Sequence, residues 1–326
     1  MSYRANIHLA GPMQYRRAIG ILRKGGVVAL PTETVYGLAA DAFNDKAVAR
    51  IYALKGRPSH NPLIAHVLSP AQAHELAVVS PAAQSLIDAF WPGPLTLVLP
   101  RRPSRLAPQA GGWLPQVALR CAHAPWREKL LSGGWTSPLF MPSANVSGHI
   151  SPTTAQHVAD DFGDAVELIL DGGACSGGIE STVLAVEDDH CVLLRPGALP
   201  AAALIPFAPD IRAPAPASST GPAQPSAPGM LASHYAPQAS VRLNATHARA
   251  HEVLLGFGSV VTGDLNLSPR GDLLEAARNL YSHLRALDEL QKNTPEKTSI
   301  AVAPIPDTGV GRAINDRLSR AAAERK

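Results

Sequence analysis

The sequence is poor in cysteine, in net charge and in long hydrophobic runs. Its 326 residues include three cysteines, Cys121, Cys175 and Cys191, and no CxxC pair. An odd number of widely spaced cysteines argues against a disulfide framework or a zinc ribbon and fits a reducing cytoplasm. The 29 Lys and Arg residues against 26 Asp and Glu give a net charge of +3. So small an excess does not by itself indicate nucleic-acid binding, although it leaves room for a local basic patch.

Membrane and standard nucleotide signatures are missing too. No apolar run approaches the roughly 20 residues that a membrane-spanning helix needs, and the first residues lack the charged-then-apolar pattern of a signal peptide. The chain has no GxxxxGK[ST], no GxGxxG placed after a strand, no HExxH and no GxSxG. These absences leave a soluble α/β protein with a polar pocket and no membrane partner.

The length and the composition predict two domains. Hydrophobic residues make up 46% of the chain, enough to bury a core in each domain. Proline, alanine and serine dominate from about residue 206, which favours an extended, mobile linker over a packed element. We expect a catalytic domain at 1–205, a linker and lid at 206–240, and a small C-terminal domain at 241–326. In the last, a strand, a helix, a strand and a helix near 253–255, 273–290, 300–302 and 310–323 indicate a small parallel α/β unit.

A polar octet at residues 31–38 follows the first predicted strand, 27–30. Pro31 ends this strand, and two threonine hydroxyls, a carboxylate and a phenol follow it. Ligands of open α/β sheets tend to bind where strands lead into their loops. The same residues are also typical of a turn whose hydroxyls cap a following helix. The octet alone leaves both interpretations open.

Four cations stand at the ends of predicted elements. Lys55 ends a helix that Asn44 or Asp45 caps, and the Gly56–Pro58 break places Arg57 across a turn from it. The pair can converge on one anion, or can be an ordinary basic helix end. Arg120 and Arg195 end or follow two short strands. Such cations suit phosphates and carboxylates.

Small polar groups accompany these cations. His66 lies in a predicted strand at 61–67, where a hydrogen-bonded core histidine is as natural as a reacting one. Ser143 and Asn145 follow a strand at 139–141, and Ser151 precedes a helix at 154–161. Several strands therefore end in polar loops, which favours one shared pocket over separate solvent-exposed polar residues.

Seven motifs occur in the order found in the YrdC-like family, and the chain resembles its two-domain branch, the L-threonylcarbamoyladenylate synthases. The motifs are Pro31 to Leu38; Lys55-Gly56-Arg57-Pro58 with Asn61-Pro62-Leu63; Trp91-Pro92-Gly93-Pro94-Leu95-Thr96; Pro142-Ser143-Ala144-Asn145; Glu180-Ser181-Thr182-Val183; Leu194-Arg195-Pro196-Gly197; and His234-Tyr235-Ala236-Pro237. The resemblance implies an α/β fold with a YrdC-like open twisted sheet and helices, and a smaller Rossmann-like C-terminal domain joined by a proline-rich linker.

The resemblance also implies an activity. Enzymes of this family make L-threonylcarbamoyl-AMP and pyrophosphate from L-threonine, bicarbonate or carbon dioxide, and ATP. A separate tRNA threonylcarbamoyl transferase complex then modifies the adenosine beside the anticodon of ANN-decoding tRNAs. We therefore expect a cytoplasmic nucleotidyltransferase that uses Mg²⁺ with ATP, has no dedicated metal ligands, and has at most a weak tRNA contact of its own.

Carried over position by position, the family pattern gives the expected site. Lys55 and Arg57 are the implied catalytic residues. The implied L-threonine site comprises Thr32 or Thr34, His66, Arg120 and Ser181. The implied ATP site comprises Lys55, Arg57, Asn61, Ser143, Asn145, Ser151, Arg195 and Tyr235. We further expect the linker to close over the pocket as a lid through His234 and Tyr235.

Two other functions fit part of the pattern. A non-catalytic module for tRNA or double-stranded RNA would use the four cations equally well, but would not need the small hydroxyl loops or the histidine. Carbamoyl transfer of the hydrogenase-maturation type uses a related domain. The sequence lacks the cysteine-rich zinc segments and the acylphosphatase-like region of that class.

Overall fold

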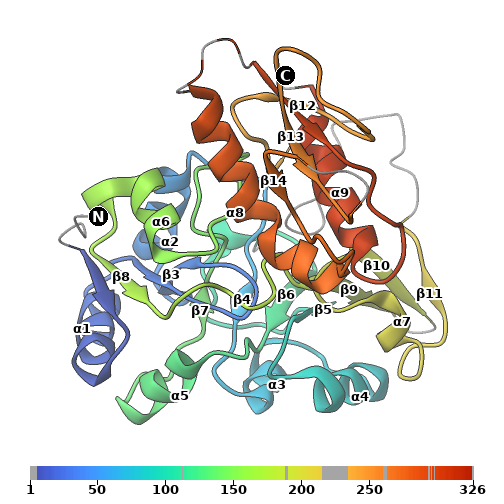
Figure 1. Ribbon diagram of the computed structural model, residues 1–326. Coiled ribbons are helices and arrows are strands. Elements are labelled where there is room, and N and C mark those ends of the chain that lie inside the picture. Colours follow the sequence, from blue (N-terminus) through green and yellow to red (C-terminus); the bar gives the residue numbers. More distant parts are fainter. Residues whose placement is uncertain are drawn as a thin grey trace.

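The computed structural model describes residues 6–111, 113–187, 190–214, 234–259, 263–292, 294, 296 and 298–324. Two α/β units of unequal size lie against each other, with the smaller C-terminal unit covering one side of the larger one (Figure 1). Most of the expected linker, at 215–233, lies outside the described residues. The domain boundaries expected at 205 and 240 remain a prediction.

The larger unit is built on one mixed sheet, which confirms the expected open α/β architecture. Among the described residues, its eleven strands are arranged in the order β1-β8-β2-β3-β7-β4-β6-β5-β9-β10-β11. In chain order they are β1 (Ile7–Leu9), β2 (Val28–Leu30), β3 (Gly37–Asp41), β4 (Ala65–His66), β5 (Leu95–Pro100), β6 (Gln116–Arg120), β7 (Leu139–Phe140), β8 (Leu168–Asp171), β9 (Thr182–Val186), β10 (Cys191–Arg195) and β11 (Ile211–Arg212).

Helices flank this sheet, most of them where the apolar spacing predicts them and two, at Pro125–Ser132 and Ala201–Leu204, where it does not. They are α1 (Pro12–Arg23), α2 (Asp45–Lys55), α3 (Ala73–Leu76), α4 (Pro81–Phe90), α5 (Pro125–Ser132), α6 (Ala155–Phe162) and α7 (Ala201–Leu204), with 3₁₀ turns at Pro70–Gln72, Pro108–Ala110 and Gly163–Ala165. The Asn44 side chain caps α2 by accepting a hydrogen bond from the Ala47 amide, and Gly56 ends it with a φ of 58°. Lys55 thus stands at a sharply defined helix end.

The C-terminal unit is a small parallel α/β domain, as expected. Its strands β12 (Ser240–Arg242), β13 (Glu252–Gly256), β14 (Leu265–Asn266) and β15 (Ser299–Val302) are arranged in the order β12-β15-β13-β14. All three pairings are parallel. The helices are α8 (Leu273–Lys292) and α9 (Gly311–Ala322). The predicted strand-helix-strand-helix order corresponds to β13, α8, β15 and α9, and the short edge strands β12 and β14 were not predicted.

Three local expectations need correction. Of the two interpretations left open for the octet, the helix cap is wrong, because the octet runs into β3, which begins at Gly37 and pairs antiparallel with β2. The expected strand at 61–67 pairs in the sheet only at Ala65–His66 within the described chain, since Pro62 has no N–H to donate. The start of the expected linker is packed, because Ile211–Arg212 pairs with β10.

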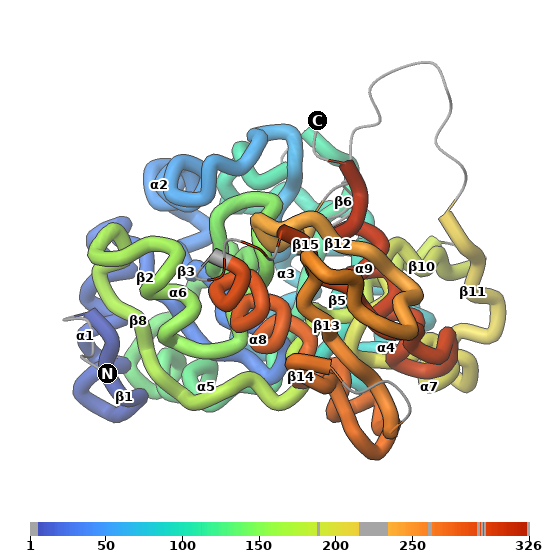
Figure 2. Tube along the Cα trace, turned by 45° about the horizontal axis from the view of Figure 1, so that its top comes forward, coloured from blue at the N-terminus to red at the C-terminus, as the bar shows by residue number. Residues whose placement is uncertain are grey.

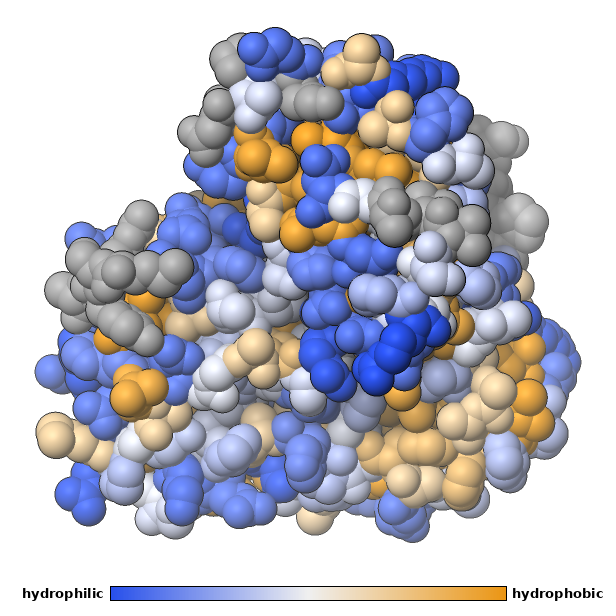
Figure 3. All heavy atoms as spheres, in the orientation of Figure 1, coloured by the Kyte–Doolittle hydropathy of each residue, from blue (hydrophilic) through white to orange (hydrophobic). Residues whose placement is uncertain are grey.

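The two units share hydrophobic contacts. The apolar cluster at the core of the C-terminal unit also contains Val35, Ile150 and Ile179 from the larger unit. Helix α8 lies alongside α6 (Figure 2), and Arg285 of α8 forms an ion pair with Asp161 of α6 at 2.9 Å. The visible outer face, by contrast, mixes hydrophilic and hydrophobic residues, with hydrophobic ones gathered at the end that holds α4 and α7 (Figure 3). The C-terminal unit is therefore seated on the larger one by packing as well as by charge.

Gly178 gives a test of this seating. Its φ is +74°, and a Cβ at this position would come within 2.4 Å of the Ala277 carbonyl oxygen of α8. Gly178→Ala should therefore destabilise the protein by about 1–3 kcal/mol more than Gly173→Ala. Gly173 is the matched control, because its φ is +84° and a Cβ there meets nothing within 4 Å. Urea unfolding of both variants measures the difference. Equal losses would mean that α8 does not press on this loop.

Candidate functional site

One open pocket, with an empty volume of about 590 Å³, gathers most of the residues expected to form the site. Nine of them line it: Thr32, Thr34, Arg57, His66, Arg120, Ser143, Ser181, Arg195 and Tyr235. They come from strand ends and loops far apart in the sequence. The remaining four expected residues, Lys55, Asn61, Asn145 and Ser151, are not among the residues that line this pocket.

Strand pairing explains how two of these residues come together. His66 on β4 and Arg120 on β6 are register partners in neighbouring parallel strands. Both side chains are buried. Burial and the neighbouring Arg120 charge hold the pKa of His66 well below its usual value, so the imidazole is neutral near pH 7. Within the described part of the chain its Nδ1 atom has no hydrogen-bond partner. This nitrogen is itself buried, and the His66 side chain lines the pocket.

The octet loop is held by its own hydroxyl groups. Thr32 Oγ1 donates to the Val35 carbonyl at 2.7 Å and accepts from the Thr34 and Val35 amides, both at 3.1 Å. It also lies 2.8 Å from Thr34 Oγ1. The Tyr36 hydroxyl donates to the Gly173 carbonyl at 2.7 Å, which anchors the loop at the end of β8. Thr32 is therefore engaged within the loop, whereas the Thr34 hydroxyl has capacity left for a ligand.

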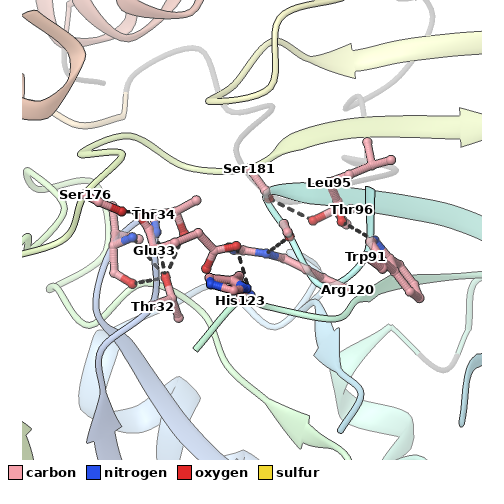
Figure 4. Close-up of polar contacts among 12 residues, drawn as sticks. Thr32, Glu33, Thr34, Trp91, Leu95, Thr96, Arg120, His123, Ser176 and Ser181 are labelled. Atoms are coloured by element: carbon pink, nitrogen blue, oxygen red, sulfur yellow. Dashed lines mark hydrogen bonds and ion pairs between the residues drawn. The ribbon is translucent and has the colours of Figure 1, made fainter. Parts of the chain in front are cut away.

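Glu33 provides the counter-charge for Arg120 in this loop (Figure 4). Its Oε1 lies 2.7 Å from Arg120 Nη2, in an ion pair rather than a well-aligned hydrogen bond. The same oxygen accepts a hydrogen bond from the His123 amide at 3.2 Å. Arg120 Nε donates to the Gly93 carbonyl at 3.3 Å. An anion that binds Arg120 would therefore share the guanidinium with Glu33.

Ser181 belongs to a second polar group on the opposite wall (Figure 4). Its hydroxyl lies 2.8 Å from the Thr96 hydroxyl on β5. Arg195, at the end of β10, donates to the Ser181 hydroxyl at 3.1 Å and to the Ser181 carbonyl at 2.9 Å. We had not assigned a role to Thr96, although its position in the Trp-Pro-Gly-Pro-Leu-Thr motif marked it.

Lys55 and Arg57 occupy different positions. Arg57 lines the pocket and is held by the Asn61 and Pro62 carbonyls at 3.1 and 2.9 Å. Burial lowers its pKa to about 10, which leaves it charged near neutral pH. Lys55 Nζ instead donates to the Ser143 and Asn145 carbonyls at 2.7 and 2.6 Å. In this structure the lysine ties the end of α2 to the Ser143 loop, and its expected catalytic role remains a prediction.

Of the other three residues outside the pocket lining, Asn145 and Ser151 form side-chain hydrogen bonds and Asn61 forms none among the described residues. Asn145 Nδ2 donates to the Val146 and His149 carbonyls at 2.8 and 2.9 Å. Ser151 Oγ donates to a Glu180 carboxylate oxygen at 2.6 Å. The Asn61 side chain is fully buried, and neither of its polar atoms has a hydrogen-bond partner in the described residues.

Glu180 is a pocket residue to which sequence reasoning gave no role, although it stands in the Glu-Ser-Thr-Val motif. It is buried, and it accepts hydrogen bonds from Ser151, from Tyr281 of α8 and from Arg317 of α9. Burial alone would raise its pKa, but Arg317, Arg195 and the Ser151 hydrogen bond together lower it to about 2. Glu180 is thus a permanently charged carboxylate on the pocket wall. No local sequence pattern links it to Tyr281 and Arg317, which lie over 100 residues away.

His234 and Tyr235 close one side of the pocket and are both buried. Tyr235 has a φ of 62°, in the left-handed region, and its ring stacks on Tyr281 at 5.9 Å between centroids. The Arg317 guanidinium lies 4.9 Å from the centre of the Tyr235 ring. Burial and the neighbouring Arg57 charge lower the pKa of His234 to about 3. The expected lid residues therefore cover the pocket in this structure, whereas their closure as a motion remains a prediction.

The described residues do not form a metal centre. No group of three or more His, Cys, Asp or Glu side chains among them could hold a metal ion. Glu180 lines the pocket, but its two oxygens are occupied by Ser151, Tyr281 and Arg317. These side chains therefore do not fit a magnesium ion held by the protein itself.

Two family models together match nearly the whole chain. The Sua5/YciO/YrdC model, described as "Telomere recombination", matches residues 20–197, and the model "Threonylcarbamoyl-AMP synthase, C-terminal domain" matches residues 201–323. The chain belongs to the Sua5/YciO/YrdC family. The second match places it in the two-domain branch, as expected from the motifs.

Individual members of the Sua5/YciO/YrdC family align over nearly their full length. The threonylcarbamoyl-AMP synthase of Bacillus subtilis is 38% identical and aligns with 96% of this chain and 94% of its own. That of Pyrococcus abyssi is also 38% identical, over 95% and 94%. The crystal structure of P. abyssi Sua5 complexed with L-threonine superposes with a TM-score of 0.85, at 36% identity over 97% of this chain and 96% of that one.

The buried His234 predicts a loss of stability in weak acid. Its pKa is about 3 in the folded protein against 6.5 in an unfolded chain, so the unfolded state binds more protons below pH 6.5. This one group should make the protein about 2 kcal/mol less stable at pH 5 than at pH 7. Urea unfolding at both pH values tests it, and His234→Gln should reduce the loss of stability between pH 7 and pH 5 by about 2 kcal/mol, with His157 accounting for part of the rest.

Tyr235→Phe is the control for this experiment, because it changes the same segment without removing an imidazole. It should keep the wild-type dependence on pH. If His234→Gln also kept the wild-type dependence of stability on pH, that dependence would come from other groups. One such group is His157, whose pKa burial lowers to about 4.

Proposed function

We propose that this protein is a threonylcarbamoyl-AMP synthase, which makes L-threonylcarbamoyl-AMP and pyrophosphate from L-threonine, bicarbonate or carbon dioxide, and ATP. The observation that carries the proposal is the convergence of Arg57, Arg120 and Arg195 with small hydroxyl groups in one pocket of a chain from this family. The printed names of the relatives and the L-threonine complex of P. abyssi Sua5 support the same activity.

L-Threonine is assigned to the end of the pocket near Arg120. Arg120 would bind its carboxylate, sharing the guanidinium with Glu33. His66, whose buried Nδ1 has no hydrogen-bond partner among the described residues, and the Thr34 hydroxyl are the groups suited to the threonine side chain. Ser181 completes this end of the pocket. Thr34 is a better candidate than Thr32, whose hydroxyl is engaged within its own loop.

ATP is assigned to the part of the pocket near Arg57, Ser143, Arg195 and Tyr235. Four residues of the expected ATP site lie outside the pocket lining and would support it indirectly: Lys55, Asn61, Asn145 and Ser151. Lys55 and Asn145 shape the Ser143 loop, and Ser151 holds Glu180. The expected catalytic pair is therefore proposed with divided roles, in which Arg57 faces the phosphates and Lys55 fixes the loop.

The reaction joins two anions, which is why it needs buried cations. The threonine amine and bicarbonate form a carbamate and release water. A carbamate oxygen then attacks the α-phosphorus of ATP, and the bond between the α-phosphorus and its bridging oxygen breaks, so that pyrophosphate leaves with the electron pair. Like charges that approach each other cost several kcal/mol unless fixed cations offset them. Arg57 and Arg195 are held in place by backbone carbonyls before any substrate arrives, so they supply this offset without rearrangement.

The substrate is proposed to be magnesium ATP, with the metal carried by the phosphates and water. The product would pass to the tRNA threonylcarbamoyl transferase complex, which places the reaction in the cytoplasm. The structure describes no helix with both the length and the hydrophobicity to cross a membrane.

An RNA-binding module is not favoured. The four cations that suggested it, Lys55, Arg57, Arg120 and Arg195, are each at most 9% exposed. Nucleic-acid phosphates are bound by arginine and lysine side chains that reach the surface. The three arginines instead line a small-molecule pocket, and Lys55 is bonded to backbone carbonyls beside it.

The test is pyrophosphate release from magnesium ATP with L-threonine and bicarbonate each supplied or omitted. Release should need both, and L-serine should be a poor replacement because it lacks the methyl group that L-threonine presents. Arg57→Met should reduce kcat/KM at least 100-fold, since an arginine that offsets phosphate charge contributes several kcal/mol.

Exposed Arg102 provides the matched control. Arg102→Met removes the same charge from the surface and should leave kcat/KM within about twofold of the wild type. Release of pyrophosphate without threonine, or none from folded protein, would refute the assignment.

A further inference from the structure

The contacts of Glu180 indicate a role for the C-terminal unit. Glu180 precedes β9 in the larger unit, lines the pocket and is buried. Tyr281 Oη donates to its two oxygens at 3.1 and 2.9 Å, and Arg317 Nε donates to Oε2 at 2.8 Å. Ser151 Oγ donates to Oε1 at 2.6 Å. We call these four residues the Glu180 cluster. Half of it comes from the C-terminal unit.

The Glu180 cluster touches three separate segments of the pocket wall. Glu180 immediately precedes Ser181 in the chain, so the two share a peptide bond. Arg317 Nη2 donates to the Pro196 carbonyl at 3.0 Å, next to Arg195. Both C-terminal side chains also contact the Tyr235 ring: the Arg317 guanidinium lies 4.9 Å from its centre, and the Tyr281 ring stacks on it at 5.9 Å between centroids. Two side chains of the C-terminal unit therefore hold the wall at 180–181, at 195–196 and at 235.

Contacts that only held the two units together would not need a charged carboxylate at the pocket. Arg285 and Asp161 already form an interdomain ion pair away from the pocket, with both side chains largely buried. Unlike that pair, the Glu180 cluster places a charged carboxylate beside the proposed phosphate site. Such a charge repels a triphosphate unless a cation compensates it at short range. Arg317 is buried against Glu180 and provides that compensation.

We propose that Tyr281 and Arg317 are positioning residues of the reaction, through which the C-terminal unit completes the pocket of the larger unit. They act through Glu180 and Tyr235 and touch no substrate themselves. This inference rests on the proposed function. It assigns the C-terminal unit a direct part in substrate binding, beyond covering the catalytic domain.

The experiment compares Tyr281→Phe and Arg317→Met with wild-type protein in two measurements, melting temperature and the Michaelis constants for ATP and L-threonine. Tyr281→Phe keeps the ring and removes the hydroxyl, so Glu180 loses one of its donors. We expect at least fivefold higher Michaelis constants from this variant. Arg317→Met removes the cation that pairs directly with Glu180 and with Asp316, so that Arg195 alone adds positive charge near the carboxylate, and we expect kcat/KM to fall at least 100-fold.

A second change separates charge from packing. Glu180→Gln in the Arg317→Met background removes the carboxylate charge and should recover at least tenfold in kcat/KM. A structural role alone gives no reason for this rescue of substrate binding. If Arg317→Met does not fold, Tyr281→Phe and the double variant decide the question.

Arg242→Met is the matched control. Arg242 forms an ion pair with buried Glu252 inside the C-terminal unit, away from the pocket. It should lower the melting temperature while leaving the Michaelis constants within twofold. If Tyr281→Phe and the double variant, like Arg242→Met, lose stability but keep wild-type Michaelis constants, the inference is refuted.

Calorimetric titration with ATP separates this inference from the proposed function. If wild-type protein binds ATP but releases no threonine-dependent pyrophosphate, the proposed function fails. In that case, weaker ATP binding by Tyr281→Phe than by Arg242→Met would still support a positioning role, and equal binding would refute it.

Discussion

The Glu180 carboxylate is the interaction on which the arrangement of the two units depends. A buried carboxylate is costly unless its charge is paired and its oxygens are hydrogen-bonded. Here the partners come from Ser151 in the larger unit and from Tyr281 and Arg317 in the smaller one. Neither unit alone can satisfy the group. The charge therefore penalises any arrangement in which the C-terminal unit is displaced, and hydrophobic contacts shared across the boundary act in the same direction.

The pocket beside this carboxylate is organised before a ligand binds. Arg57 and Arg195 are held mainly by backbone carbonyls, and Lys55 is held by the two carbonyls of the Ser143 loop. Carbonyl partners position a cation without neutralising its charge, so the guanidinium groups keep most of their attraction for an anion. A site for the approach of two negatively charged reactants needs cations of this kind.

Sequence reasoning reached the fold and most of the pocket, and its failures have physical causes. Polar residues at strand ends, such as Arg120 and Ser143, could be recognised because parallel strands bring such ends together. The octet was correctly identified as pocket-forming, but the strand after it was not, because a buried run of Gly, Leu and Ala carries no period. Glu180, Tyr281 and Arg317 form a cluster whose members have no local sequence relation. Lys55 was assigned to the anion from its charge and from the family pattern, although its position on the apolar face of α2 with Val48 and Ile51 already indicated burial.

Arg120 has an acidic partner in the octet loop. Glu33 already occupies part of its guanidinium, so the free pocket presents a compensated charge rather than a strong anion site. A carboxylate that approaches Arg120 must fit beside Glu33, which limits binding to ligands that gain other contacts at the same time. His66 and the Thr34 hydroxyl lie along the same pocket and offer such contacts to an amino acid that carries its own hydroxyl. The ion pair therefore weakens binding of simple anions more than it weakens binding of L-threonine, which turns a general anion site into a selective one.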